Sequence, residues 1–227
     1  MNNAMNNKNT FVINSLIVLG MWVLSAWAWR VIPDGSPIPV HYGIDGTPDR
    51  YGGKFEGLLL FPIVAAALTM LFTFLPRIEP RAQNLIRSQK AYSITWLASI
   101  LLLCALHVAT VLKAIGWSID VAAIVSVGVG VLFVVIGNYL GKVRSNFFFG
   151  IRTPWTLSSE YSWNRTNRLG GRLLFGLGIG CILATLANAN QLFFILVLGG
   201  SIGITLFLVV YSYVLWKNDP TRQEIEH

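Results

Sequence analysis

The chain contains six apolar segments, each close to the roughly 20 residues that an α-helix needs to cross a bilayer. They cover residues 11–29, 57–75, 94–112, 119–140, 173–187 and 191–216. The fifth is short, so we expect its helix to begin earlier, in the basic stretch before it. Backbone groups inside a bilayer need partners within the protein, and a helix supplies them locally. The pattern predicts an all-α fold, a polytopic membrane helix bundle with six transmembrane helices.

Composition favours a membrane protein over a soluble one. Only 12% of the residues are charged and 54% are hydrophobic, whereas a soluble domain carries about 25% charged residues. The net charge of +7 would suggest nucleic acid in a soluble protein. Here the basic residues flank apolar segments and no nucleic-acid-binding fold accompanies them, so no direct nucleic acid binding is predicted. Cys104 and Cys181 fall inside apolar segments, and no Cys/His spacing predicts a metal site or cofactor.

Lysine and arginine lie mainly on one side of the predicted bundle. With six spans, the N-terminus, the loops after the second and fourth spans, and the C-terminal tail share a side, which holds 13 of the 17 basic residues. The other side holds the remaining 4, which are Arg30, Arg50, Lys54 and Lys113. Cytoplasmic loops of membrane proteins carry the excess of Lys and Arg. The distribution predicts that both termini are cytoplasmic, and it supports the number of six spans.

Small residues recur at a spacing that lets two helix backbones approach closely. The pairs are Gly137 with Gly141, Gly176 with Gly180, and Gly199 with Gly203. We expect them to serve packing inside the bundle rather than a dimer interface.

The loop between the first two spans is rich in proline and glycine. Three prolines between residues 33 and 39 oppose a helix, and Asp45-Gly46 is a turn dipeptide. The loop is therefore predicted to form a compact, irregular outer cap with a polar tip. Two interpretations remain open: a rigid linker that lets the first two spans pair, or a binding surface for an extracytoplasmic molecule.

Residues 138–172 form a long basic interruption between the fourth and fifth spans, with six of the 17 Lys and Arg residues. Thr153-Pro154 is typical of the start of a turn or helix, and Thr156 and Ser158 are candidates for a helix cap. We expect a short interfacial helix that runs into the fifth span, with Trp155 and Trp163 at headgroup depth.

Within this stretch, arginines recur at helical spacing. Arg165, Arg168 and Arg172 fall on one predicted face, and Trp163, Asn167 and Gly170 fall on another. Topology and contact with anionic lipid account for the charge. They do not account for the ordered run from Asn146 through Trp163, which indicates a functional surface.

Two parts of the chain resemble a known family. One part resembles the signature of the SdpI-like bacterial immunity proteins, and it consists of Asn138, Lys142, Asn146, the run GIRTPWT at 150–156, and Trp163. The outer stretch IPVHY at 38–42, followed by Gly46, Asp49 and Lys54, resembles the domain of unknown function often found at the N-terminal end of that family. The matches cover about the first 75 residues and the region from the fourth span to the fifth.

The resemblance implies a multi-pass protein of the bacterial cell membrane that protects a cell from a secreted peptide toxin. In the best-known system the immunity protein also holds a small DNA-binding repressor at the membrane. The implied partners are membrane lipid, the toxin and a cytoplasmic helix-turn-helix repressor. We divide the chain into a two-helix unit at 1–93 and a four-helix SdpI-like unit at 94–227 with a basic cytoplasmic loop at 141–172.

The candidate site residues lie in two loops. Candidates for toxin binding at the outer loop are His41, Tyr42, Gly46, Asp49 and Lys54. Candidates for partner binding at the cytoplasmic loop are Asn138, Asn146, Arg152, Thr153, Pro154, Trp155, Trp163 and Arg168. Signalling from one loop to the other requires that toxin bind two bundle states with different affinities.

Two other functions are compatible with a polytopic membrane protein. A small transporter or channel is the alternative, since His107 is the ionisable side chain well inside a span. That histidine is most simply a hydrogen-bonded residue of the bundle. An enzyme is not predicted, because the sequence has no HExxH, no GxSxG and no pair of carboxylates within a span.

Overall fold

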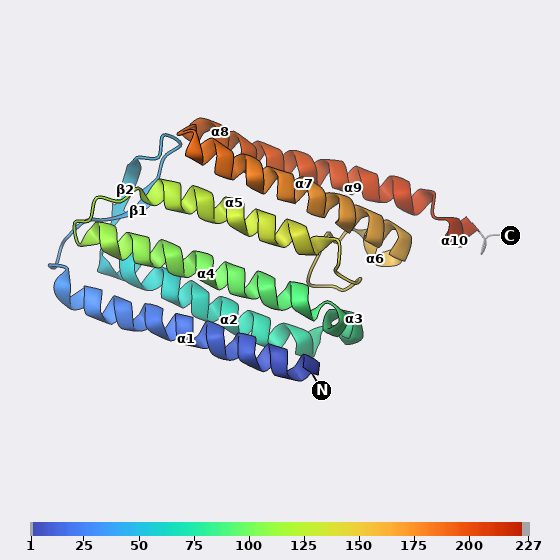
Figure 1. Ribbon diagram of the computed structural model, residues 1–227, viewed down its shortest axis with the longest axis horizontal. Coiled ribbons are helices and arrows are strands. Elements are labelled where there is room, and N and C mark those ends of the chain that lie inside the picture. Colours follow the sequence, from blue (N-terminus) through green and yellow to red (C-terminus); the bar gives the residue numbers. More distant parts are fainter. Residues whose placement is uncertain (1, 224–227) are drawn as a thin grey trace.

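The computed structural model describes residues 2–223, with side chains for residues 8–221, and in this part of the chain it confirms six membrane-length helices. Figure 1 shows them as a bundle of roughly parallel rods. The six spans are Lys8–Val31, Phe55–Ile78, Gln89–Ala114, Val121–Leu140, Glu160–Leu186 and Asn190–Lys217. Four of the six predicted segments fall within these helices, whereas the segment 119–140 begins two residues before its helix and the segment 173–187 ends one residue after its helix.

Short elements join or extend the spans. The order is α1 (Asn2–Val31), β1 (Ile38–Tyr42), β2 (Pro48–Gly52), the π-helical turn η1 (Phe55–Leu59), α2 (Leu60–Ile78), α3 (Ala82–Arg87), α4 (Gln89–Ala114), α5 (Val121–Leu140), α6 (Pro154–Ser158), α7 (Glu160–Leu186), α8 (Asn190–Phe194), the π-helical turn η2 (Ile195–Gly200), α9 (Ser201–Lys217) and α10 (Pro220–Gln223).

The bundle has two different ends. Figure 1 shows both ends of the described chain at one end of the bundle, which we call the terminal end, and β1 and β2 at the other, the hairpin end. The connections richest in Lys and Arg lie at the terminal end, as the six spans require. Arg222 was counted with them, but its side chain lies outside the described residues. That the terminal end faces the cytoplasm stays a prediction from charge.

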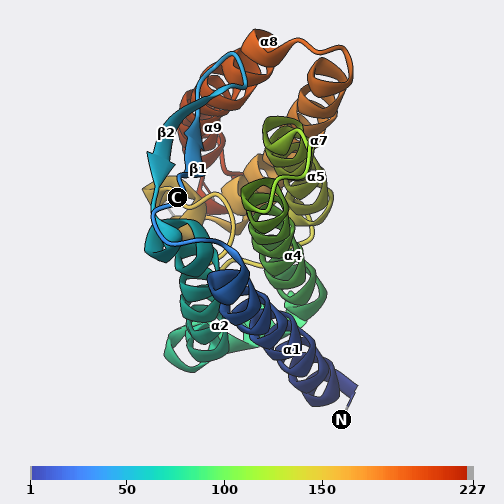
Figure 2. The ribbon, with the colours of Figure 1, turned by 90° about the vertical axis from the view of Figure 1, so that its left-hand side faces the viewer.

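The helices pack in two groups that share the central pair α4 and α5. Helices α1, α2 and α4 enclose one buried cluster around Met21, Trp96 and Ile100. Helix α7 contacts α8, η2 and α9 around Leu177 and Phe193. Figure 2, turned by 90°, shows these groups on either side of α4 and α5. Because α4 packs against α1 and α2 as well as α5, the division into 1–93 and 94–227 stays a prediction.

The outer surface of the bundle is apolar, as lipid contact requires. Large hydrophobic side chains on four different spans are more than half exposed, among them Leu16, Met70, Leu183 and Leu206. In water such a surface would drive aggregation, whereas in a bilayer it is matched to the acyl chains. The fold therefore defines an integral membrane protein.

Glycines bring α5 and α7 into backbone contact. A Cβ on Gly137 would lie 2.5 Å from the Phe175 nitrogen, and one on Gly171 would lie 2.6 Å from the Gly137 carbonyl oxygen. Gly137 and Gly141 thus serve internal packing, as predicted. A Cβ on Gly176, Gly199 or Gly203 would meet nothing within 4 Å, so the prediction of internal packing was wrong for these three.

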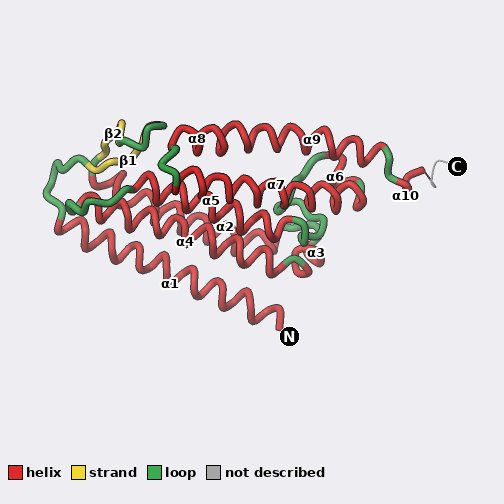
Figure 3. Tube along the Cα trace, turned by 45° about the horizontal axis from the view of Figure 1, so that its top comes forward, coloured by secondary structure: helices red, strands yellow, loops and turns green. Residues whose placement is uncertain are grey.

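The outer loop is more regular than predicted. Residues 38–52 form an antiparallel hairpin in which Ile38 lies opposite Gly52 and His41 opposite Arg50. Asp45 holds the turn by accepting hydrogen bonds from the Thr47 amide and hydroxyl at 3.0 and 2.8 Å. Gly46 has a φ of +82°, which a residue with a side chain rarely adopts. Figure 3 shows these two strands as the sheet of an otherwise helical chain.

The basic stretch forms two separate helices, not one. Thr153 caps α6. Ser159 has an extended conformation, so it separates α6 from α7, and its hydroxyl caps α7 by accepting a hydrogen bond from the Ser162 amide. The predicted caps at Thr156 and Ser158 were therefore wrong. The cap of each helix is the extended residue directly before it, whose hydroxyl accepts a hydrogen bond from a free backbone amide of the first turn. Because residues 160–172 are helical, the true connection is residues 141–159, called loop 141–159 below.

Candidate functional site

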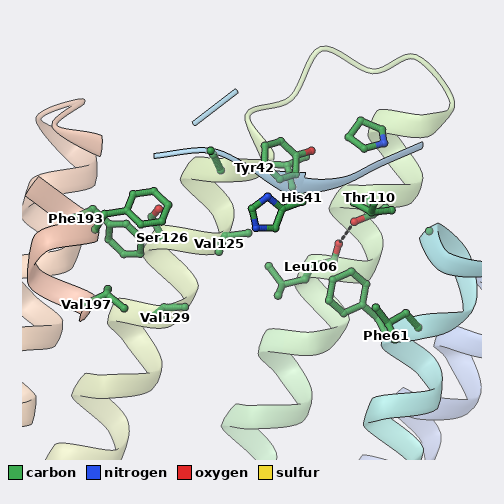
Figure 4. A pocket seen from close by; sticks show the side chains of 18 of the residues that line it. His41, Tyr42, Phe61, Leu106, Thr110, Val125, Ser126, Val129, Phe193 and Val197 are labelled. Carbon is green, nitrogen blue, oxygen red and sulfur yellow. Dashed lines mark hydrogen bonds between the residues drawn. The ribbon is translucent and has the colours of Figure 1, made fainter. Parts of the chain in front are cut away.

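A cavity of about 350 Å³ lies at the hairpin end, between the two groups of helices. Strand β1 covers it, and α2, α4, α5 and α8 form its walls, as Figure 4 shows. The lining is largely apolar, with Phe61, Leu106, Val125, Val129 and Phe193 among its residues. A concave, mostly apolar pocket with a few polar groups is the usual form of a ligand site.

The polar groups of the cavity lie mainly at its mouth. His41 and Tyr42 reach it from β1, and Glu56 from η1. Deeper in the cavity, the Thr110 hydroxyl donates to the Leu106 carbonyl oxygen at 2.9 Å within its own helix. The cavity therefore presents an apolar interior and a polar rim.

Three hydrogen-bonded pairs of polar side chains hold the hairpin above this cavity. His41 Nδ1 lies 2.6 Å from Asp49 Oδ1, and both side chains are exposed. Arg50 donates to both carboxylate oxygens of Glu56, at 3.1 and 2.7 Å. Ile38 anchors the base of the hairpin among buried residues of α1, η1 and α4. The hairpin is thus held by charge at its exposed face and by apolar packing at its base.

The third pair connects the hairpin region to the end of α1. Lys54 Nζ donates to Asp34 Oδ1 at 2.5 Å and to the Trp29 carbonyl oxygen at 3.0 Å. It also lies 5.8 Å from the centre of the Trp29 ring. Because the Lys54 side chain is only 10% exposed, its first role is to hold the fold at this end.

Local contacts shift several pKa values at the hairpin end. The hydrogen bond from Lys54, helped by its charge, lowers the pKa of Asp34. Hydrogen bonds from Thr47 lower the pKa of Asp45. Burial raises the pKa of Tyr42, with smaller contributions from Tyr51 and Asp120, so its phenol stays neutral at physiological pH.

The hairpin tip bridges to the far side of the bundle. Asn190 Nδ2, at the start of α8, donates to the Asp45 carbonyl oxygen at 3.0 Å. A Cβ on Gly46 would lie 2.8 Å from the same nitrogen. The hairpin therefore spans the cavity from the group of α1, α2 and α4 to the group of α7, α8 and α9.

The structure gathers the five outer-loop candidates at the hairpin end but in different positions. His41 and Tyr42 line the cavity. Asp49 pairs with His41, Gly46 forms the turn, and Lys54 holds the base. Their predicted role in toxin binding stays a prediction.

At the terminal end, Asn146 organises loop 141–159. Its side chain is fully buried and donates to the carbonyl oxygens of Arg144 and Phe149 at 2.8 and 2.9 Å. It accepts from the amides of Phe148 and Phe149 at 2.9 and 2.6 Å. One side chain thus takes the place of the hydrogen bonds that regular secondary structure would supply.

Glu79 and Arg81, from the connection between α2 and α3, hold the same loop from outside. The buried Glu79 carboxylate accepts from the amides of Arg81 and Phe147. The Arg81 guanidinium donates to the Ser145 hydroxyl and to the Leu157 carbonyl oxygen, and it lies 4.9 Å from the centre of the Phe147 ring. The loop is therefore a packed element and not a free linker.

The structure separates the eight candidates for partner binding. Asn146, Thr153 and Trp163 are buried. Trp163 donates to the Val143 carbonyl oxygen at 2.8 Å, so the indole nitrogen has its partner inside the protein and does not anchor in lipid headgroups; its predicted depth in the membrane stays a prediction.

The remaining candidates lie nearer the surface, at two places. Arg152 and Pro154 are exposed at the loop, and Trp155 is half-buried against the Tyr213 ring at 5.2 Å. Asn138 and Arg168 are exposed on α5 and α7, on the side of the bundle. Arg165, Arg168 and Arg172, which were predicted to share one face of this helix, lie on α7 and are all exposed.

His107 is a hydrogen-bonded residue of the bundle, as its simplest interpretation predicted. Its Nε2 lies 3.1 Å from the Ser25 hydroxyl and 3.2 Å from the Met21 carbonyl oxygen. The Ser25 hydroxyl also lies 2.7 Å from the Leu58 carbonyl oxygen. His107 thus joins α1, η1 and α4, and it does not line the cavity.

Several residues of the site escaped the sequence reasoning. Phe193 and Val197 line the cavity from α8 and η2, and Asn190 receives the hairpin. The sequence around these residues indicates an apolar span and gives no sign of a cavity. Glu79 left a weak signal, because it is the acidic residue of an otherwise basic connection between residues 76 and 93.

Known proteins match both regions that define this architecture. The profile of the SdpI/YfhL protein family matches residues 142–212, and that of a domain of unknown function, DUF1648, matches residues 16–66. Immunity protein SdpI of Bacillus subtilis (strain 168) is 26% identical over 190 residues, which are 82% of this chain and 86% of that protein. No solved structure matches.

The six membrane-length helices and the similarity to a Bacillus subtilis protein define a multi-pass protein of the bacterial cell membrane, with a hairpin-capped cavity at one end of the bundle. The chain is similar to the SdpI/YfhL family over residues 142–212 and to the DUF1648 region over residues 16–66, at its N-terminal end. The matched relative is an immunity protein by name. Among the described residues, no three His, Cys, Asp or Glu side chains gather as metal ligands would.

Proposed function

We propose that this protein confers resistance to a secreted peptide toxin and that it binds the toxin at the hairpin-capped cavity, without enzymatic turnover. The named activity of the Bacillus subtilis relative supports immunity. The observation that carries the binding site is the apolar cavity of about 350 Å³ under a polar hairpin. The residues that reach its rim include His41 and Tyr42, two of the candidates for toxin binding.

The chemistry of the cavity fits an apolar segment of a peptide. Its aliphatic and aromatic walls would cover one or a few large side chains, whose burial is favourable by about 25 cal/mol per Å² of apolar surface. The exposed pairs His41–Asp49 and Arg50–Glu56 stand above it. They offer a peptide backbone both hydrogen-bond donors and acceptors.

The hairpin connects the cavity to both groups of helices, so binding of a peptide in the cavity can affect the bundle. It contacts α8 through Asn190 and packs its base against α1, η1 and α4. A peptide under the hairpin would therefore change the relation between the two groups of helices, provided it binds their arrangements with different affinity. Loop 141–159 bridges α2, α3, α7 and α9 at the other end, through contacts of Glu79, Arg81 and Thr153.

A cytoplasmic helix-turn-helix repressor is the partner we propose at that end. Of the predicted residues, the exposed Arg152 and Pro154 and the half-buried Trp155 are available to it. Phe147, which is 39% exposed, lies beside them in the loop because Arg152 donates to its carbonyl oxygen at 2.5 Å. The buried Asn146, Thr153 and Trp163 would shape this surface without touching the partner.

A cavity-filling variant tests the site. Val125→Phe adds volume inside the cavity, and Val131→Phe adds the same volume on the 46% exposed, outer side of the same helix. Both are expressed in a strain that is sensitive to the toxin, with membrane levels compared by immunoblot.

The expected result is that the wild-type chain and Val131→Phe protect and that Val125→Phe, at an equal membrane level, loses most of its protection. Equal protection by both variants contradicts binding in the cavity. Unchanged killing of cells that express the wild-type chain, for every cognate toxin candidate, contradicts immunity itself.

A further inference from the structure

A second, basic groove lies on the side of the bundle at the terminal end. It has a volume of about 520 Å³ and runs between the last turn of α5 and the first half of α7. The residues that line it are Gly137, Asn138, Gly141, Lys142, Arg168, Gly171, Arg172 and Phe175. The family signature includes Asn138 and Lys142 of this groove, and Arg168 is a further candidate for partner binding, but the sequence did not indicate that they meet.

The groove exists because glycines form its floor. Gly137 and Gly171 bring the backbones of α5 and α7 into contact, and a Cβ on Gly141 would lie 3.1 Å from the Arg168 Cα. Between such small residues the two helices leave a shallow channel. Longer side chains rise on both sides of it.

Three cations and an amide surround this channel. Lys142, Arg168 and Arg172 are all exposed, and Asn138 adds two further hydrogen-bond donors. Within residues 8–221, no ion pair connects any of these three cations to a carboxylate. Lys142 instead lies 4.9 Å from the centre of the Tyr139 ring. The positive charge is thus available to an anion from outside the chain.

An apolar strip continues from the groove along the same face of α7. Phe175, Ile179 and Leu183 follow Arg168 and Arg172 at helical spacing, and they are 41%, 39% and 60% exposed. The cations lie in the half of the span nearer the terminal end, and the strip begins near the middle of the span and ends about one turn before Leu186. A lipid matches this order of charged and apolar surface, with its headgroup at the cations and an acyl chain along the strip.

We propose that this groove binds the phosphate headgroup of an anionic phospholipid, with one acyl chain along the strip from Phe175 to Leu183. Arginine forks suit the phosphate oxygens, and Lys142 adds a point charge. An acidic protein would fit the cations but not the apolar strip inside the span. The inference is independent of toxin immunity.

Native mass spectrometry of the full chain in a neutral detergent tests the site. Phosphatidylglycerol is titrated against the wild-type chain, against Arg168→Gln/Arg172→Gln and against the control Arg87→Gln/Arg165→Gln. The control removes the same charge from two exposed arginines at the same end, one of which lies over the Tyr161 ring, and neither of which lines the groove. Phosphatidylcholine with the same acyl chains and inorganic phosphate are the comparison ligands.

The expected result is a phosphatidylglycerol affinity about thirtyfold weaker in the groove variant, from two lost charges, and less than threefold weaker in the control. Lys142→Gln should give an intermediate loss of phosphatidylglycerol affinity. Because Lys142 lies after the end of α5, this substitution changes no residue within a helix. Melting temperatures in the neutral detergent show that each variant is folded.

Three results would overturn the proposal. Equal losses in the groove variant and the control show general attraction to charge. Competition by inorganic phosphate at the same concentration as the lipid shows a site for a free anion. A complex of two chains that the groove variant loses, at unchanged lipid binding, shows an interface between copies.

Discussion

Replacing Asn146 by alanine removes the side chain that holds loop 141–159 together. Four hydrogen bonds of 2.6 to 2.9 Å are lost, two donated and two accepted. A hydrogen bond within a protein contributes about 1 kcal/mol net, which sets an upper value of about 4 kcal/mol. Phe148 and Phe149 are only half-buried, so water can reach part of the freed backbone. We therefore expect a loss of about 2–3 kcal/mol in the free energy of unfolding.

Two measurements check this value. Reversible unfolding of the purified chain in mixed micelles gives the free energy, and hydrogen exchange gives the local effect at the amides of Phe148 and Phe149. Asn138→Ala is the matched control, because this amide is exposed on α5. Its effect should stay within about 0.5 kcal/mol.

Asn146→Asp separates the two halves of the network. The carboxylate keeps the bonds from the amides of Phe148 and Phe149 but turns an oxygen toward the carbonyls of Arg144 and Phe149. We expect protection of the two amides to remain while stability still falls. If Asn146→Ala leaves exchange at these amides unchanged and stability within about 0.5 kcal/mol of the wild type, the hydrogen bonds of Asn146 do not hold loop 141–159 together.

Two further predictions concern helix packing and pH. Gly137→Ala should destabilise the bundle by about 1–3 kcal/mol or more, since its Cβ would meet the α7 backbone at 2.5 Å, whereas Gly176→Ala, in open space, should be neutral or stabilising; equal melting temperatures would refute backbone contact. The Asp34–Lys54 pair lowers the pKa of Asp34, so its stabilisation is present above the ordinary pKa of about 3.9 and is lost as pH falls through the lowered value. The difference in melting temperature between the wild type and Asp34→Asn should be constant from pH 8 to 5 and shrink in stronger acid; a difference that changes between pH 8 and 5 would contradict this assignment.

Part of the candidate site could be predicted from local sequence. Proline, glycine and Asp45-Gly46 located the outer loop and its turn, because backbone restrictions act within a few residues. The order of residues 146–163 marked loop 141–159 as more than a linker. The cavity could not be predicted, since its walls come from β1, α2, α4, α5 and α8. Apolar residues such as Phe193 look the same in sequence whether they face lipid, a helix or a cavity.

The sequence by itself determined the class of protein, the number of spans and the side on which charge gathers. These follow from length, hydropathy and the cost of unpaired backbone groups in a bilayer, which are properties of each segment alone. Only the tertiary structure decided which signature residues are scaffold and which are surface. Asn146 turns inward because loop 141–159 folds around its side chain, and Trp163 does so because its indole nitrogen donates to the Val143 carbonyl oxygen, 20 positions away. Asn138 and Arg168, 30 positions apart, meet at one groove because glycines let α5 and α7 touch.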